Sequence, residues 1–255
     1  MLARILVLAS LAPALFAQWP AWSTSKAAAD VAAPKAADGH PDLSGIWDRG
    51  IAPPVTPPPA GRPQRSFQDL PSLFADGLPF QPWAAELRKQ RLAENSKGHP
   101  DAHCLPLHPV QLHSHPQPRK IIQTPGEVLI IYEANDGLRQ IFTDGRSLPA
   151  DPEPWWFGYS IGKWDGETLV VQSIGFRDMS WIDEEGSVMT GSGKLTERIR
   201  RVNYKTLEIE ITIDDPKAYT KPWTYKLTQN LMPATELIEF VCAENNRSLP
   251  HLVGK

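Results

Sequence analysis

Residues 206–213 read TLEIEITI, a strict alternation of polar and apolar side chains. Residues 223–231, WTYKLTQNL, repeat the alternation, with Trp223, Tyr225 and Leu227 on one face. A period of two residues is typical of a strand that buries one face and exposes the other, as strands of antiparallel sheets do. These two stretches therefore predict antiparallel β structure with one buried face.

Stretches rich in β-branched and aromatic residues follow one another along most of the chain after His99. They lie at 119–123, 127–133, 138–143, 158–164, 167–174, 194–202 and 237–242. Short turn sequences separate them, the clearest being Asp165-Gly166. A long meander protects its edge strands best by closing on itself. We therefore predict an all-β fold, an antiparallel meander that forms a β-barrel-like, lipocalin-like domain over residues 119–255, with a two-sheet β-sandwich as the alternative.

The chain before these strands divides into three parts. Residues 1–17 combine one charge, an apolar run and small residues suited to cleavage after Ala14 or Ala17, which are features of a secretory signal peptide. Residues 18–40 are Ala-rich and polar, and we expect a disordered leader there. Residues 41–118 are rich in proline and predict an irregular wrap with one short helix near 82–95.

Composition and charge narrow the classes of function. The 255 residues include 26 Lys+Arg and 29 Asp+Glu, a net charge of −3, which argues against nucleic acid as a partner. The 26 prolines exclude a helical bundle, because each interior proline costs a helix about 3 kcal/mol. No apolar run reaches the roughly 18 residues that a transmembrane segment needs. We expect a periplasmic or secreted protein whose partner is a small molecule, and the oligomeric state is left open.

Cys104 and Cys242 are the only cysteines of the chain. Two cysteines in an exported protein most simply form one disulfide bond. Two buried free thiols are the alternative. We predict a Cys104–Cys242 bridge.

Polar residues fall on the faces that should be buried. Glu197 shares a face with Leu195 and Ile199, so it needs a partner or a raised pKa. Arg139 or Arg201 could provide a structural ion pair. Alternatively, polar groups inside an apolar barrel can orient a ligand. The first hypothesis is therefore a barrel that binds a small, partly apolar or aromatic molecule in its interior.

Aromatic residues could complete such a site. Trp155 and Trp156 are adjacent and cannot both point into a core from a strand, so one should lie at a surface or at the mouth of the cavity. Packing beneath the N-terminal wrap is the alternative. The predicted ligand-binding residues are Trp155, Trp156, Trp223, Tyr225 and Gln229.

Five of the seven histidines lie between residues 99 and 115. His113 and His115 have the spacing that places two imidazoles on one face of a strand, a usable pair of metal ligands, with a third from His103, His108 or Glu133. Because prolines at 106, 109, 116 and 118 disfavour a regular strand, no cofactor is predicted. A metal, if bound, would use His113 and His115.

The second hypothesis is an enzyme on the same scaffold. A histidine near Glu197 could serve as a general base for hydrolysis, elimination or isomerisation. Its candidate catalytic residues are His113, His115, Glu197, Tyr159 and Arg139. An envelope interaction protein that uses the proline-rich wrap is a third class.

Several segments together resemble a large group of exported bacterial proteins of unknown function. They are PDLSGIW (41–47), RQIFTDGR (139–146), GKWDGETLVV (162–171), TER (196–198) and DPKAYTKPW (215–223). The resemblance covers about residues 41–255 and implies an exported bacterial protein, without implying an activity. In that group a histidine often occupies the position of Tyr159, and a histidine-rich turn precedes the TER segment. Here residues 187–193 read SVMTGSG, so a metal site of that kind is not implied.

Overall fold

The computed structural model describes residues 31–49, 69–244, 247 and 251. The predicted signal peptide (1–17), residues 18–30 of the expected leader and residues 50–68 of the proline-rich wrap lie outside the described residues. Among the described residues, no helix has the length and apolarity needed to cross a bilayer.

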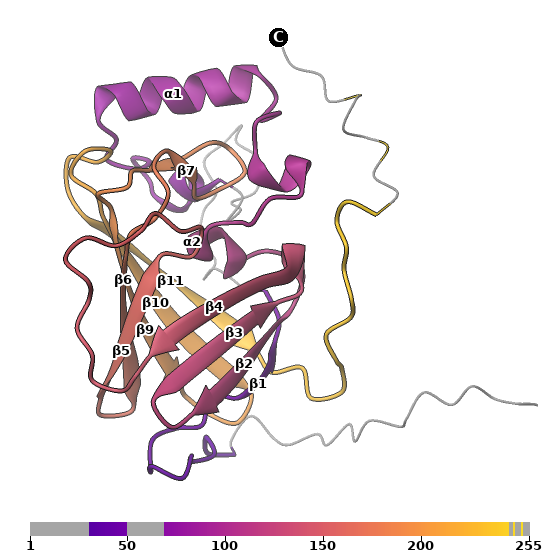
Figure 1. The fold of residues 1–255 in the computed structure, drawn as a ribbon. Coiled ribbons are helices and arrows are strands. Elements are labelled where there is room, and N and C mark those ends of the chain that lie inside the picture. Colours follow the sequence, from indigo (N-terminus) through magenta and orange to yellow (C-terminus); the bar gives the residue numbers. More distant parts are fainter. Residues whose placement is uncertain (1–30, 50–68, 245–246, 248–250, 252–255) are drawn as a thin grey trace, which may run out of the picture.

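Nine strands form one sheet that curls into a nearly closed barrel (Figure 1). In their order across the sheet they are β1 (Gly45–Trp47), β2 (Arg119–Thr124), β3 (Glu127–Tyr132), β4 (Gly137–Phe142), β5 (Tyr159–Asp165), β6 (Thr168–Ile174), β9 (Lys194–Arg201), β10 (Thr206–Asp214) and β11 (Trp223–Asn230). A bridge between Trp47 and Leu231 brings the first and last strands together. The predicted all-β, barrel-like fold is confirmed. A separate small sheet pairs β7 (Ser180–Trp181) with β8 (Val188–Met189).

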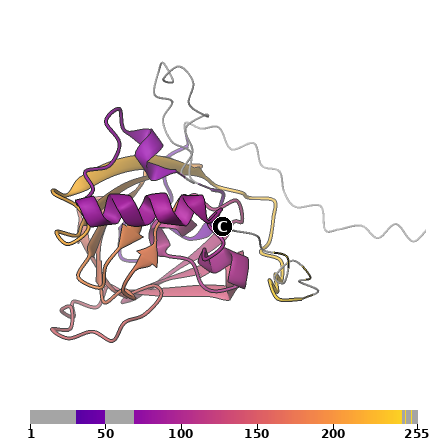
Figure 2. The same ribbon diagram turned by 90° about the horizontal axis from the view of Figure 1, so that it is seen from above.

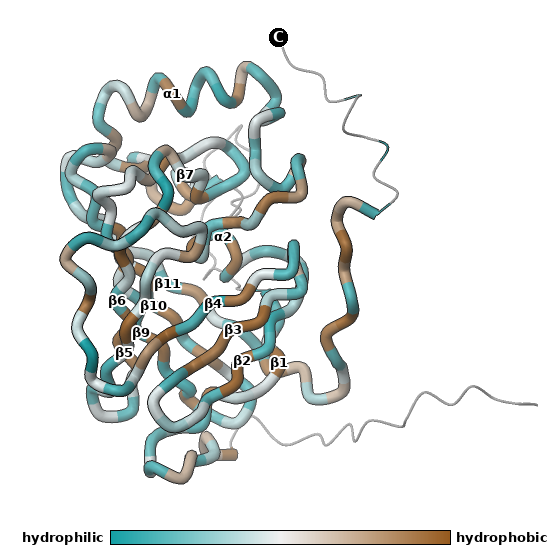
Figure 3. The backbone as a smooth tube through the Cα atoms, in the orientation of Figure 1, coloured by the Kyte–Doolittle hydropathy of each residue, from teal (hydrophilic) through white to brown (hydrophobic). Residues whose placement is uncertain are grey.

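The core follows the alternation seen in the sequence. Leu207, Ile209, Ile211 and Ile213 of β10 all point into the barrel and are buried. Figure 3 shows apolar residues concentrated along the strands. Burying such side chains contributes on the order of 1.5–3 kcal/mol each, which fixes the register of β10 between β9 and β11.

One strand pairing departs from the predicted antiparallel meander. β4 and β5 run parallel, and only two residue pairs join them, Ile141 with Ser160 and Phe142 with Ile161. A parallel pairing needs a connection that returns to the starting end of the first strand, and residues 143–158 provide it. The first half of β4 therefore diverges from the chain that leads into β5, and we call this divergence the β4–β5 splay.

The segment between residues 69 and 118 covers one end of the barrel (Figures 1 and 2). It contains η1 (Leu70–Leu73), α1 (Pro82–Ala93), η2 (Pro100–His103) and α2 (Pro109–Leu112). The predicted helix is α1, which begins at a proline because the first helical position needs no N–H donor. All four residues of α2 are buried, and this turn lies in the mouth of the barrel. A further turn, η3 (Ala134–Asp136), joins β3 to β4.

As the prolines indicated, His113 and His115 do not lie on a strand, because α2 ends at Leu112 and the chain continues as a turn. One local expectation was wrong. The described end of the expected leader, residues 31–40, packs on the barrel instead of lying free. Lys35 pairs with Glu167 at 2.6 Å, and the His40 ring stacks on Trp164 at 4.5 Å.

The predicted strand at 237–242 was also wrong. It forms no ladder with β11, whose end meets β1 only near Leu231, where the Met232 N–H donates to the Ile46 carbonyl at 2.8 Å. The segment runs alongside the barrel, and its Ile238 side chain is 67% exposed (Figure 3). Its Cys242 is bonded to Cys104, so the predicted disulfide is confirmed.

Replacing both cysteines with serine should destabilise the protein. The disulfide spans a sequence separation of 138 residues, for which the chain-entropy model gives about 4–5 kcal/mol of unfolding free energy. Denaturant unfolding of C104S/C242S against the oxidised parent measures the difference. Equal unfolding midpoints would show that the bridge only tethers the last residues.

Candidate functional site

An ion pair lies at the centre of the barrel. Arg139 of β4 and Glu197 of β9 are both fully buried, and the guanidinium meets the carboxylate through two nitrogens. Nη1 donates to Oε1 at 2.9 Å, and Nη2 donates to Oε2. Of the two arginines considered for Glu197, Arg139 is therefore the partner. The Arg201 guanidinium instead donates to backbone carbonyls of Asp42, Ser44 and Tyr204.

Two serines complete the coordination of the guanidinium. Arg139 Nε donates to Ser160 Oγ at 3.3 Å, and Nη2 also donates to Ser173 Oγ at 3.0 Å. The two hydroxyl oxygens are 2.8 Å apart. Ser160 belongs to β5 and Ser173 to β6, so one side chain of β4 is hydrogen-bonded to residues of both following strands.

His113 contacts the same carboxylate. Its Nε2 lies 2.5 Å from Glu197 Oε1. The His113 carbonyl accepts from Arg119 Nη1 at 2.6 Å and from Gln229 Nε2 at 2.9 Å, which holds the residue beneath α2. Sequence analysis placed His113 near Glu197 only as a hypothesis, since the register of the turn after α2 could not be derived from the pattern.

Burial and the charges of this cluster determine its protonation. Burial opposes ionisation of Glu197, but the charge and hydrogen bonds of Arg139, together with His113, outweigh it, so the pKa of Glu197 lies well below its usual range. Burial also lowers the pKa of His113, although Glu197 partly offsets this effect. His113 is therefore a neutral imidazole that donates its Nε2–H to an ionised carboxylate.

Some buried polar atoms around this cluster lack a hydrogen-bond partner among the described residues. They are His113 Nδ1, His108 Nε2 and Gln229 Oε1. With Nε2 protonated, Nδ1 of His113 carries a free lone pair, the arrangement of a general base held by a carboxylate. The His113 side chain is only 2% exposed, however. Proton transfer to a substrate would require the surrounding chain to move.

The other interior candidates face protein. Tyr225 Oη lies 3.5 Å from the Val110 carbonyl of α2, and Trp223 packs against Phe74, Tyr219 and Tyr225. His115 is separate from His113 in its contacts, with Nε2 3.9 Å from Asp101. Within the described part of the chain, no group of three or more ligating side chains could hold a metal ion.

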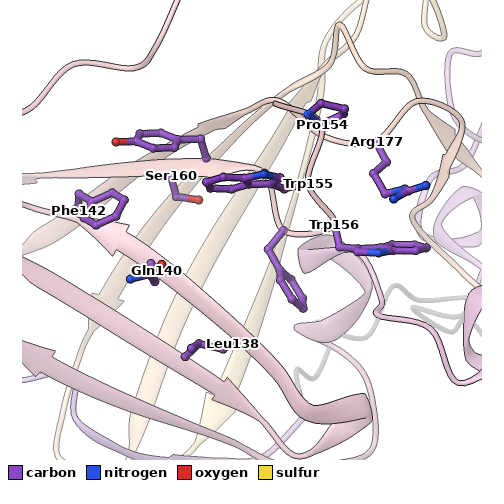
Figure 4. Close-up of a pocket in the computed structure, with 11 residues that line it drawn as sticks. Leu138, Gln140, Phe142, Pro154, Trp155, Trp156, Ser160 and Arg177 are labelled. Carbon is purple, nitrogen blue, oxygen red and sulfur yellow. The ribbon is translucent and has the colours of Figure 1, made fainter. Parts of the chain in front are cut away.

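A groove opens on the outer wall of the barrel at the β4–β5 splay (Figure 4). We call it the β4–β5 groove; its volume is about 330 Å³. Outward-facing residues of β4 form one side, and the chain entering β5 forms the other. Its lining residues are Leu138, Gln140, Phe142, Pro154, Trp155, Trp156, Phe157, Gly158, Tyr159, Ser160 and Arg177.

Aromatic rings dominate one part of this groove. The Phe142 and Tyr159 rings lie 5.4 Å apart, and the Trp155 ring lies 6.1 Å from Tyr159. The Trp155 side chain is 51% exposed, and Figure 4 shows it projecting over the groove. Trp155, Trp156 and Tyr159, three of the residues predicted from sequence, therefore meet here, on the outer wall and away from Trp223, Tyr225 and Gln229.

The backbone around the groove is fixed. Trp155 N–H donates to the Gly175 carbonyl at 2.9 Å, and Arg177 N–H donates to the Trp155 carbonyl at 3.1 Å. Gly158 has a φ of +63°, and a Cβ there would lie 2.7 Å from both the Ile174 carbonyl oxygen and the Phe176 ring. Only glycine permits this close approach. The backbone that carries Trp155 and Tyr159 is thus fixed before any ligand binds.

The groove and the buried ion pair share a wall. Ser160 lines the groove and also accepts a hydrogen bond from Arg139. Phe157 lines the groove and stacks on Tyr132, a buried residue of β3, with ring centroids 6.0 Å apart. Sequence reasoning missed Leu138, Gln140, Phe142 and Arg177. The available signal was the apolar character of Leu138 and Phe142 on the face of 138–143 opposite to Arg139.

Replacing Glu197 with glutamine should destabilise the fold strongly. The substitution keeps the shape of the side chain but leaves the Arg139 charge buried without a counter-charge, and breaking one partner of a buried pair costs about 3–5 kcal/mol. Glu208→Gln, on the exposed face of β10, is the matched control and should have little effect. Equal unfolding midpoints for E197Q and the parent would contradict a structural role of the pair.

Stability should fall as the pH falls below about 6.5. Burial and the Arg139 charge lower the pKa of His108 to about 3 in the folded state, so the unfolded chain takes up a proton near pH 6.5 while the folded chain does not. Between pH 7.5 and 5 this difference removes about 2 kcal/mol.

His108 directly precedes α2, and His108→Asn retains an acceptor for the Val110 N–H; this variant should reduce the pH dependence. Urea unfolding of both proteins at the two pH values measures the effect, and His103→Asn, at an exposed histidine, is the control. The same slope in H108N and in the parent would rule out His108 as its source.

The comparisons with known proteins add no relative. No protein-family model, no curated protein and no solved structure matches this chain. Function must therefore be argued from the geometry and chemistry of the site itself.

Proposed function

We propose that this protein binds a small molecule containing an aromatic ring in the β4–β5 groove. The proposal rests on one observation: the rings of Phe142, Trp155 and Tyr159 lie together around this groove, and Trp155 is half exposed. Aromatic rings prefer offset or edge-to-face contact at centroid separations of about 4.5–7 Å. A planar ligand ring inserted here would gain such contacts and cover the exposed Trp155 surface.

The size and rigidity of the groove support this proposal. Its volume of about 330 Å³ lies at the lower end of the roughly 300–1,000 Å³ typical of small-molecule pockets. That volume suits a compact ligand. Because Gly158 and the backbone bonds of Trp155 fix the lining, little conformational entropy is lost on binding.

The outer wall is a better position for the ligand than the barrel interior that the sequence suggested. The side chains that would have lined an interior cavity, Glu197, Tyr225 and Gln229, contact Arg139, α2 and the turn after it. The class of ligand is the one that the sequence suggested, but the proposed site lies at the β4–β5 splay.

We propose an exported location as well. The Cys104–Cys242 disulfide is a bond that persists in oxidising compartments, such as the periplasm or the extracellular space. The N-terminal residues 1–17 have the composition of a signal peptide. The ligand would then be a compound that the cell meets outside its cytoplasm.

An enzyme remains the second candidate, because of one specific observation. His113 has Nε2 against Glu197 and an unpartnered Nδ1, which is the orientation of a general base. Incubating a bound ring compound with the protein and recovering it by NMR distinguishes the two functions. Unchanged ligand supports a binding protein, and a new product that His113→Asn abolishes supports the enzyme.

Replacing Trp155 with alanine should weaken ring binding at least tenfold, because a tryptophan that the bound ligand covers typically contributes about 2 kcal/mol or more to binding. Titration with indole and with 2-naphthol, followed by calorimetry or NMR, measures the affinity. Trp83→Ala removes another exposed tryptophan, one on α1, and is the matched control. The proposal fails if neither compound saturates a site at millimolar concentration, or if W155A and W83A bind equally.

A further inference from the structure

The β4–β5 groove has one charged side chain in its lining. That residue is Arg177, and no aspartate or glutamate lines the groove. Figure 4 shows Arg177 beside Trp156, on the other side of Trp155 from Phe142. The groove therefore has an aromatic part and a positively charged part.

The Arg177 guanidinium is available to a ligand. It lies 4.8 Å from the Trp156 ring centroid, a cation–π contact, and the residue is exposed. Its side chain forms no ion pair or hydrogen bond with the residues that the structure describes. The backbone is held at both ends of the residue, because its N–H donates to Trp155 and its carbonyl accepts from Ser180 Oγ at 2.6 Å.

Arg146 lies at the opposite side of the aromatic part, and its positive charge has an acidic partner. Its guanidinium lies 3.8 Å from the Phe142 ring centroid, but it also pairs with Asp144 through several hydrogen bonds. The acidic residue beside Arg177 in sequence, Asp178, accepts from the Gly191 N–H instead. Arg177 thus keeps an unneutralised charge at the groove.

We propose that the ligand of the β4–β5 groove is an aromatic carboxylate, a deepening that rests on the proposed function above. Its ring stacks against Trp155, and its carboxylate accepts hydrogen bonds from Arg177. A guanidinium presents paired N–H donors that match a carboxylate in a bidentate geometry. Because the whole chain has a net charge of −3, it offers no general attraction to anions, so any preference for an acid must be local.

Three indole derivatives of similar size separate charge from ring stacking. We expect indole-3-acetate to bind about tenfold more tightly than neutral indole-3-acetamide, and cationic tryptamine to bind more weakly than both. Arg177→Gln should lower the affinity for the acetate to that for the acetamide and leave the acetamide unchanged, whereas Arg177→Lys should retain part of the preference. Arg198→Gln, at an exposed arginine of β9 that pairs with Asp165, is the control and should change neither affinity.

The possible failures are distinguishable. Equal affinities for the acetate and the acetamide, unchanged in R177Q, overturn the carboxylate assignment and leave ring binding intact. No binding of any of the three compounds overturns both proposals. Naphthalene-2-sulfonate and naphthalene-2-carboxylate form a second pair with a common ring. Tighter binding of the sulfonate would show that the carboxylate is the wrong anion.

Discussion

The barrel is built around the buried pair of Arg139 and Glu197. Two ions removed from water are costly unless their hydrogen bonds are complete, and here the guanidinium meets the carboxylate, Ser160 and Ser173 together. These contacts join β4 to β5, β6 and β9. The parallel join of β4 and β5 has only two residue pairs. The side-chain bonds of Arg139 therefore reinforce the barrel wall at a place where its backbone pairing is weak.

The same pair accounts for the position of both candidate sites. Inside the barrel, Glu197 also holds His113, so α2 and its following turn occupy the space where a lipocalin-like barrel would hold a ligand. Outside the barrel, the splay that Arg139 bridges leaves room for a groove between Phe142 and Trp155. The interior side chains thus contact one another, and the outer wall carries the groove in which we propose that a ligand binds. This division favours a binding protein over an enzyme that uses the buried histidine.

Sequence reasoning predicted those features that depend on local periodicity and on the cost of burying charge. The alternation in 206–213 predicted β10. The position of Glu197 among apolar residues predicted either a partner or a raised pKa, and the structure shows the partner. Features that depend on long-range geometry could not be derived in this way. The groove combines residues 138–142, 154–160 and 177, which only the parallel join brings together. The segment 237–242 has a strand-like composition, but it pairs with none of the strands that the structure describes, and composition alone does not show whether a partner strand lies within reach.

One end of the barrel is covered by the segment from α1 to α2 (Figure 1). A molecule held on the flank does not have to pass this cover. It can dissociate without any helix or strand moving, so its residence time depends only on its own contacts. Such a flank site suits rapid exchange with the surrounding medium and is poorly suited to long-term storage.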